Sequence, residues 1–328
     1  MFMNKYLRWG MRLIGPLLLI YILSRTNLAN LAQVLREIDV WPLLLSLALL
    51  PVFLIVKSWR WNMLMAELGI TPPSLGYTMA LYCIGLFYGG ATPGQSGDFL
   101  KAVYLRDRGP VAPALFSILL DRLFDFMIMA PLALLTLVAF PDLVPQSAQA
   151  IAIAGAVAFI LATPLLMARG VRNWAMNLVQ PILPTKLRTL LEKWRDQFDA
   201  LSLRPGLMIN LMLASVGSAT ATMVRIWLLY LALRLYNVNI LAIVGSTALI
   251  ALLQTLPISF SGVGVRDAVL LAVLAAYGYS PAQAIALSAL FLVINIEHII
   301  VGFLVSLRYP LGDVPETQSA EFKTSGPT

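Results

Sequence analysis

The chain alternates long runs of apolar residues with short polar breaks. The runs free of charged residues cover 13–24, 41–56, 68–97, 148–168 and 235–265. Three further apolar stretches have the length of membrane-crossing helices, at 111–140, 207–233 and 282–307. A transmembrane β-barrel would instead alternate apolar and polar positions. The pattern therefore predicts an all-α polytopic integral membrane protein with about six full transmembrane helices.

Composition and charge support this class. Hydrophobic residues make up 59% of the chain and charged residues 12%, so too little polar surface remains to coat a soluble globule. The net charge of +7 is compatible with nucleic-acid binding, but the basic residues cluster between the apolar runs. Membrane topology and anionic headgroups explain that placement better, so we expect anionic or phosphate-bearing membrane lipids as partners and no nucleic acid. With one cysteine, Cys83, and one histidine, His298, we expect no disulfide framework, no metal site and no cofactor.

The charge-free run at 68–97 ends in a proline- and glycine-rich break, Ala91–Asp98, and charged residues follow it. Such a break frees backbone groups, which a membrane tolerates only where they are buried in protein or line a watery cavity. The loop at 141–149 has no Lys or Arg and is therefore expected outside, so both ends of segment 73–108 are expected in the cytoplasm. We predict a re-entrant hairpin over 73–108 with its tip at Gly94 to Gly97.

The second half of the chain repeats this order of features. A charge-free run is again followed by a proline- and glycine-rich break, Leu256–Asp267, and by another apolar segment. In each half an arginine precedes the proline of the break by a similar distance, Arg60 before Pro93 and Arg225 before Pro257. We therefore hypothesise two structural repeats.

The repeats cover about 41–140 and 207–307 and are predicted to have opposite orientations in the membrane. The second hairpin, 241–278, would then enter from the outside, and the two hairpins would meet at mid-membrane. The alternative is that 241–256 and 265–278 are two ordinary spans, which charge bias does not distinguish.

The remaining segments fix the expected topology. The basic N-terminus and the strongly basic loop at 169–206 are expected in the cytoplasm, and the last helix, 282–307, would bring Arg308 and the C-terminus there as well. Leucine-rich stripes at 28–38 and 187–201 predict amphipathic helices that lie on the membrane surface. Residues 1–310 thus form a single transmembrane domain, and 311–328 form a polar cytoplasmic tail that we expect to be disordered.

The apolar run at 41–56 ends in Lys57 and Arg60, framed by Trp59 and Trp61. Cations flanked by tryptophans are typical of a membrane interface, so we predict that this helix ends there, at the cytoplasmic edge. Arg60 is interpreted either as such an anchor or as part of a polar site.

Other charged residues lie inside the predicted helices, where each costs roughly 2.5–3.5 kcal/mol on insertion scales. They are Asp121, Arg122, Asp125, Arg225 and Glu297, and His298 follows the last of them. Asp121 and Asp125 share one helix face. One interpretation is a structural ion pair of either acid with Arg225 or Arg266.

The other interpretation is a polar path along which an anionic headgroup moves, held by Arg60, Arg225 and Arg266. Glu297 and His298 could relay protons in such a path, because histidine titrates near neutrality. Adjacent residues on a helix point about 100° apart, so at most one of these two is expected to face the path.

Three stretches resemble the motif regions of a known membrane domain: GGATPGQSGDFLKAVYL at 89–105, DRLFD at 121–125 and PISFSGVGVRDAVL at 257–270. They are similar to those in the membrane domain of bacterial lysylphosphatidylglycerol synthases, a family that includes stand-alone members and members associated with hopanoid or glycolipid pathways. The resemblance extends over nearly the whole chain. Members often have GGD where this chain has Ser96–Asp98, which leaves open whether both glycines are needed for close backbone approach.

The resemblance implies a domain that flips a lipid with a polar or phosphorylated headgroup between the leaflets of a bacterial or archaeal cytoplasmic (inner) membrane. By motif, the residues in this role would be Pro93, Gly97, Asp98, Asp121, Arg122, Asp125, Pro257, Gly262, Gly264, Arg266 and Asp267. In the synthases a separate soluble domain performs aminoacyl transfer. We expect no such activity here, because no polar stretch of this chain is long enough for that domain.

We therefore expect a lipid translocase or flippase-like transporter that is not an enzyme. The sequence has no Walker loop, HExxH or GxSxG motif for ATP-driven transport or standard hydrolase chemistry. The alternative is a membrane-embedded enzyme or accessory subunit for transfer onto a lipid carrier, with Asp121 and Asp125 as candidate acids. A scaffold for lipid-biosynthesis enzymes is a third hypothesis, but it leaves the intramembrane charges unexplained.

Overall fold

A computed structural model describes residues 36–90, 92–140, 169–182, 204–255 and 265–309, together with a few positions between 153 and 199. Every regular element in these residues is a helix. Several predicted segments lie wholly or largely outside the described residues: the first helix at 13–24, the stripes at 28–38 and 187–201, the span at 148–168, the break with Pro257, Gly262 and Gly264, and the tail.

Four helices of the described part are long and apolar enough to cross a membrane. They are the helix pair α3–α4 (Val40–Ala48 and Leu50–Glu67), α6 (Val111–Ala139), α10 (Pro205–Ala232) and α13 (Pro281–Arg308). The hydrophobic pattern predicted the last three to within a few residues. Their starts follow ordinary rules, because Pro281 occupies the first turn of α13 and Ser280 forms a capping box with Gln283.

The predicted end of the second helix near Val56 is wrong. The chain bends at Leu49, just before Pro51 in the first turn of α4, and α4 then continues to Glu67. A proline cannot donate a backbone hydrogen bond, which accounts for the break. Lys57 and Arg60 therefore lie within a helix and not at its edge, and both are buried.

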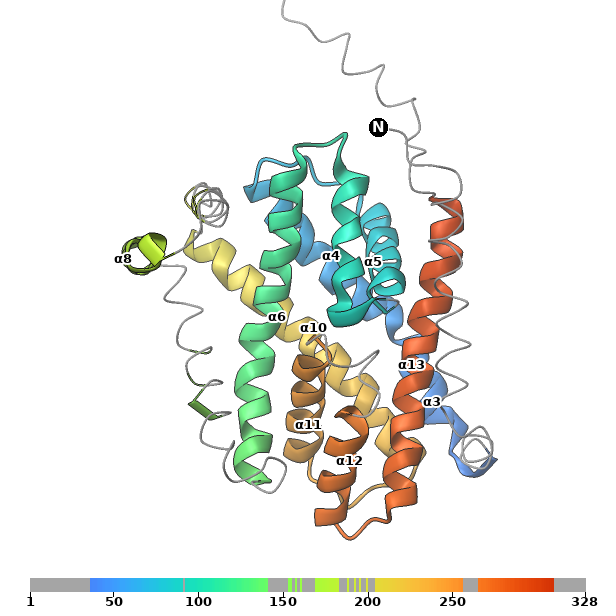
Figure 1. The fold of residues 1–328 in the computed structure, drawn as a ribbon. Helices are drawn as coiled ribbons and strands as arrows, with labels where there is room; N and C mark the ends of the chain where they lie inside the picture. Colours follow the sequence, from blue (N-terminus) through green and yellow to red (C-terminus); the bar gives the residue numbers. More distant parts are fainter. Residues whose placement is uncertain are drawn as a thin grey trace, which may run out of the picture.

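The first broken segment forms a helical hairpin (Figure 1). It consists of α5 (Leu75–Gly90) and the 3₁₀ helix η1 (Pro93–Leu105), which pack against each other. The chain turns between Gly90 and Pro93, because Thr92 is extended and Pro93 begins η1. The tip therefore lies a few residues before the predicted Gly94 to Gly97.

A second pair of helices, α11 (Ile240–Leu253) and α12 (Val265–Ala276), also packs side by side. Figure 1 shows the two pairs entering the bundle from opposite ends, so that the turn of the first hairpin faces the inner ends of α11 and α12. The two hypothesised repeats and their opposite orientations in a membrane stay predictions.

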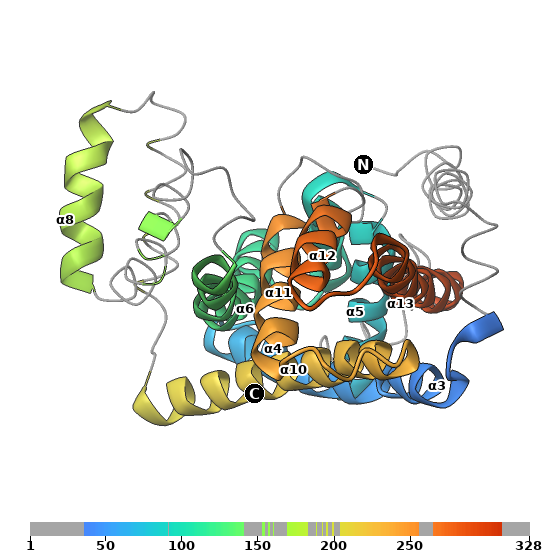
Figure 2. The ribbon, with the colours of Figure 1, turned by 90° about the horizontal axis from the view of Figure 1, so that it is seen from below.

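Each pair packs on the last long helix of the other half of the chain. Helix α5 packs on α13, and α11 packs on α6. Both contacts are close at a glycine: a Cβ at Gly302 would lie 2.1 Å from the Cys83 carbonyl oxygen, and one at Gly245 would lie 2.2 Å from Thr136 Oγ1. Helices α3, α4 and α10 form a layer along one side of the bundle (Figure 2).

Helix α8 (Arg169–Val179) lies within the basic loop at 169–206, outside the stripe predicted to be helical. It stands apart from the bundle in Figure 2. Its Trp174 and Leu178 are exposed and lie four residues apart on one face.

Candidate functional site

A cavity of about 250 Å³ lies between the turn of the first hairpin and the inner end of α11. The first hairpin contributes Gly89, Thr92 and Gln95 to its wall, and α11 and the turn after it contribute Gln254 and Thr255. Helices α4, α6, α10 and α13 complete the lining. The turn of the first hairpin and the inner end of α11 thus border the same cavity.

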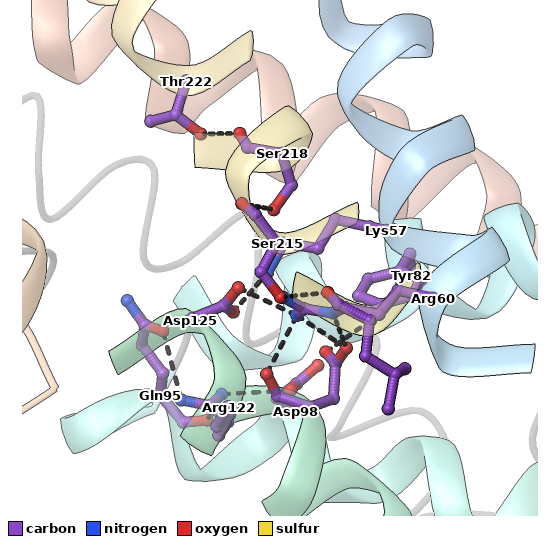
Figure 3. Close-up of polar contacts among 12 residues, drawn as sticks. Lys57, Arg60, Tyr82, Gln95, Asp98, Arg122, Asp125, Ser215, Ser218 and Thr222 are labelled. Atoms are coloured by element: carbon purple, nitrogen blue, oxygen red, sulfur yellow. Dashed lines mark hydrogen bonds and ion pairs between the residues drawn. The ribbon is translucent and has the colours of Figure 1, made fainter. Parts of the chain in front are cut away.

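Arg60 of α4 lies behind the cavity wall and binds the two acids of α6 that line it, Asp121 and Asp125. Its side chain is fully buried, and its Nε donates to Asp121 Oδ1 at 2.8 Å. Its Nη2 also donates to the Asp121 carbonyl oxygen at 2.9 Å and lies 2.8 Å from Asp125 Oδ1, while Nη1 donates to Ser215 Oγ at 2.9 Å. Tyr82 of α5 donates its hydroxyl to Asp121 as well. Helices α4, α5, α6 and α10 therefore meet at one buried ion pair (Figure 3).

Lys57 lies about one helical turn before Arg60 and pairs with Asp125, and both Lys57 and Asp125 line the cavity. The Asp125 side chain is 26% exposed, compared with 4% for that of Asp121. Asp125 is thus the acid of this pair of carboxylates that an occupant of the cavity can reach, and Lys57 is the cation beside it.

A second ion cluster ties the first hairpin to α6. Asp98 Oδ1 lies 2.7 Å from Lys101 Nζ, and Asp98 Oδ2 accepts from Arg122 Nη2 at 3.1 Å. Arg122 also donates to the Gln95 carbonyl oxygen at 3.0 Å, so it fixes the turn that follows Pro93 (Figure 3). Its Nε is buried without a hydrogen-bond partner. The ammonium of Lys101 lies over the rings of Tyr82 and Trp61, and these cation–π contacts offset part of the cost of burying its charge.

Uncharged polar groups occupy the other side of the cavity. They are Ser218 and Thr222 of α10, Gln254 and Thr255 after α11, and Asn295 and His298 of α13. Ser218 and Thr222 donate their hydroxyls to carbonyl oxygens of their own helix, Ser215 and Ser218 respectively, at 3.0 Å. Each hydroxyl oxygen can still accept a hydrogen bond from an occupant. The cavity thus has one side with charged groups and another side with hydroxyl and amide groups.

Arg225 of α10 lies outside the cavity lining and binds the backbone of α3. Its Nε donates to the Ser46 carbonyl oxygen at 2.9 Å, and Ser46 Oγ donates back to the Arg225 carbonyl oxygen at 2.9 Å. Its Nη2 pairs with Glu297, and its Nη1 lies 3.0 Å from His298 Nε2. Of the two adjacent residues on α13, only His298 lines the cavity, in keeping with the expected divergence of their side chains.

Arg266 and Asp267 fix the start of α12 to α13. Arg266 Nε donates to Ser288 Oγ at 2.7 Å, and Ser288 donates its hydroxyl to Asp267. Arg266 is buried, stands over the Phe291 ring and has no hydrogen-bond partner at Nη1. Neither residue lines the cavity.

The predicted ion pairs of Asp121 or Asp125 with Arg225 or Arg266 are wrong. The partners of the two acids are Arg60 and Lys57, because α4 and not α10 or α12 presents its cations to that face of α6. The interpretation of Arg60 as an interface anchor is wrong for the same reason.

Four further residues of the site were not predicted from the sequence: Lys57, Tyr82, Gln95 and Lys101. A signal existed for two of them: Lys57 precedes Arg60 by three residues, and Lys101 follows Asp98 by three, the spacing of neighbours on one helix face. No such signal exists for Tyr82 or Gln95. Of the other motif residues, Gly97 lies in η1, which begins at Pro93, and does not line the cavity.

No group of three or more His, Cys, Asp or Glu side chains is placed to hold a metal ion in the described part of the chain.

The family model for the lysylphosphatidylglycerol synthase TM region matches residues 10–302. The chain belongs to this family, as its motifs suggested, and is a membrane protein related to lipids. Comparisons with curated proteins and with solved structures found no significant match.

Proposed function

We propose that this protein is a lipid translocase that moves a lipid with a polar or phosphorylated headgroup between leaflets. The observation that carries the proposal is the cavity with Lys57, Arg122 and Asp125 in its wall, enclosed by helices apolar enough to cross a membrane. Charged groups at bilayer depth are costly and mark substrate paths more often than they serve as ordinary packing.

The charged side of the cavity suits a phosphate. Lys57 and Arg122 both reach the cavity, and a phosphate oxygen accepts strong charge-assisted hydrogen bonds from such cations. The hydroxyl and amide groups across the cavity would hold the uncharged polar part of the headgroup, while the acyl chains stay in the surrounding lipid.

The opposed helix pairs supply a route from either leaflet. We propose that both are re-entrant hairpins of an inverted repeat in a cytoplasmic membrane, with both termini in the cytoplasm. Transporters built on inverted repeats place their substrate site near the midplane, where broken helices meet, and alternate its access by moving one repeat against the other. The position of the cavity between the turn at Pro93 and the end of α11 supports this mechanism.

We further propose that the protein is a transporter and not an enzyme. Each acid of the described cavity wall, Asp98, Asp121 and Asp125, is paired with at least one cation. A carboxylate held ionised by a cation is a weak general acid or base, so the arrangement favours binding over proton transfer to a substrate.

The test is translocation of a labelled lipid by the purified protein. We expect protein reconstituted into phosphatidylcholine vesicles to expose an inner-leaflet fluorescent phosphatidylglycerol to an external quencher faster than empty vesicles do. Lys57→Met should slow this by roughly ten- to hundred-fold, because one charge-assisted hydrogen bond contributes about 1.5–3 kcal/mol. Arg122→Gln should act in the same direction.

Arg106→Gln is the matched control. Arg106 pairs with Asp107 at an exposed site outside the cavity, so its loss should leave the rate unchanged. Elution of each variant as a single species separates a transport defect from misfolding. Wild-type rates in folded Lys57→Met and Arg122→Gln would contradict the proposal.

A further inference from the structure

His298 is the single histidine of the chain, and its ring lies in the cavity wall. It is partly exposed and stacks on Phe53 of α4, with ring centroids 6.5 Å apart and an angle of 17° between the planes. This packing holds the ring plane in one orientation. The two ring nitrogens therefore face different neighbours, and Nε2 faces Arg225.

The partner of Nε2 determines the protonation state of the ring. Arg225 Nη1 lies 3.0 Å from His298 Nε2. A guanidinium has only donors, so Nε2 must accept and cannot carry a proton. The ring is therefore neutral, with its proton on Nδ1.

Arg225 is itself fixed in place. Its Nε is bound to the Ser46 carbonyl oxygen and its Nη2 to Glu297, so the guanidinium cannot turn away to admit a proton on His298. The other charged groups near this part of the cavity are Lys57, whose Nζ lies 5.7 Å from the centroid of the Phe53 ring, and Asp125, its partner. Glu297 is engaged by Arg225 and Asp125 by Lys57 and Arg60, so neither acid pairs with an imidazolium.

We propose that His298 is a permanently neutral hydrogen-bond donor that presents Nδ1–H to an acceptor oxygen of the headgroup, and that it does not carry protons. Among the hydrogen bonds of the described residues, none engages Nδ1. Arg225 is the positioning residue that selects this tautomer. The donor role rests on the proposed function, whereas the tautomer does not.

The tautomer is tested by nitrogen NMR of protein labelled with ¹⁵N-histidine in phosphatidylcholine nanodiscs. A single histidine gives one pair of ring signals. We expect a protonated Nδ1 and an unprotonated Nε2, with no change between pH 5 and pH 8. Titration within this range, or a proton on Nε2, would overturn the proposal. In Arg225→Met the constraint is removed, and we expect His298 to titrate.

The donor role is tested by two amides of different reach in the vesicle assay with fluorescent phosphatidylglycerol. An asparagine at this position places its NH₂ near Nδ1, and a glutamine places it near Nε2. We expect His298→Asn to retain translocation within about threefold, and His298→Gln and His298→Leu to lose about tenfold. Equal rates in all three, or faster rates with glutamine, would contradict the donor role. Vesicles with wild-type protein that translocate nothing would contradict the proposed function, while the NMR result would stand.

Discussion

Replacing Arg60 by methionine is expected to lower the free energy of unfolding by about 3–5 kcal/mol, because removing one partner of a buried pair leaves an unpaired buried charge. Arg60 is fully buried and binds the Asp121 side chain, the Asp121 carbonyl oxygen and Ser215. Its removal would leave Asp121 with only the Tyr82 hydroxyl among its described hydrogen-bond donors. Thermal unfolding in detergent measures the effect as a lower midpoint.

The control is Arg106→Met, at an exposed pair whose atoms are 3.8 Å apart. Exposed pairs contribute about 0–1 kcal/mol, so its unfolding midpoint should stay close to that of the wild type. If the buried charge is the cause, adding Asp121→Leu to Arg60→Met should recover part of the lost stability. A small effect of Arg60→Met alone would mean that the four helices do not meet at this pair.

Gly97→Val should be nearly as damaging, because the first hairpin closes through contact of two backbones. A Cβ at Gly97 would lie 2.2 Å from the Tyr88 carbonyl oxygen, and neither backbone can yield without separating α5 from η1. The Gly97 amide also donates to Thr92 Oγ1 at 2.6 Å. Overpacking of this kind costs about 1–3 kcal/mol or more. We expect a lower unfolding midpoint and loss of translocation together.

Gly90→Ala is the matched control in the same hairpin. The nearest atom to a Cβ at Gly90 is 3.5 Å away, on the Ile299 side chain, which is ordinary contact. The exposed Ser96 already shows that the first position of the SGD sequence accepts a side chain, so only the second glycine of the usual GGD is required here. An unfolding midpoint of Gly97→Val equal to that of Gly90→Ala would contradict the close approach.

The hydrophobic pattern was sufficient for three of the four long helices of the described part and for the break after Gly90. Helices α6, α10 and α13 were predicted to within a few residues, because length and hydropathy are properties of a single segment. The turn of the first helical hairpin followed from the proline- and glycine-rich break, whereas its re-entrant course in a membrane stays a prediction.

The pairing of the charges could not be predicted in the same way. Lys57 and Arg60 follow an apolar run and lie between tryptophans, which is also the pattern of a helix end at an interface. The acids that pair with them, Asp121 and Asp125, lie on another helix, and a sequence does not show which helices face each other. A buried cation with a buried partner therefore has the same local sequence as a membrane anchor.

The cavity could not be predicted from the sequence for a related reason. Its wall combines charged residues of α4, η1 and α6 with hydroxyls and amides of α10, α13 and the turn after α11, and no single segment carries this pattern. Thr222 and Gln254 have no charge or motif to mark them, and only the packing of the helices brings them to the same place.

If this cavity holds a lipid headgroup, phospholipid should remain bound to the purified protein, and native mass spectrometry detects it. Thr222→Trp places an indole in the cavity, whereas Val216→Trp places one on an exposed face of the same helix. We expect wild type and Val216→Trp to retain phospholipid and to translocate it, and folded Thr222→Trp to do neither. Equal retention and equal translocation in Thr222→Trp would contradict it.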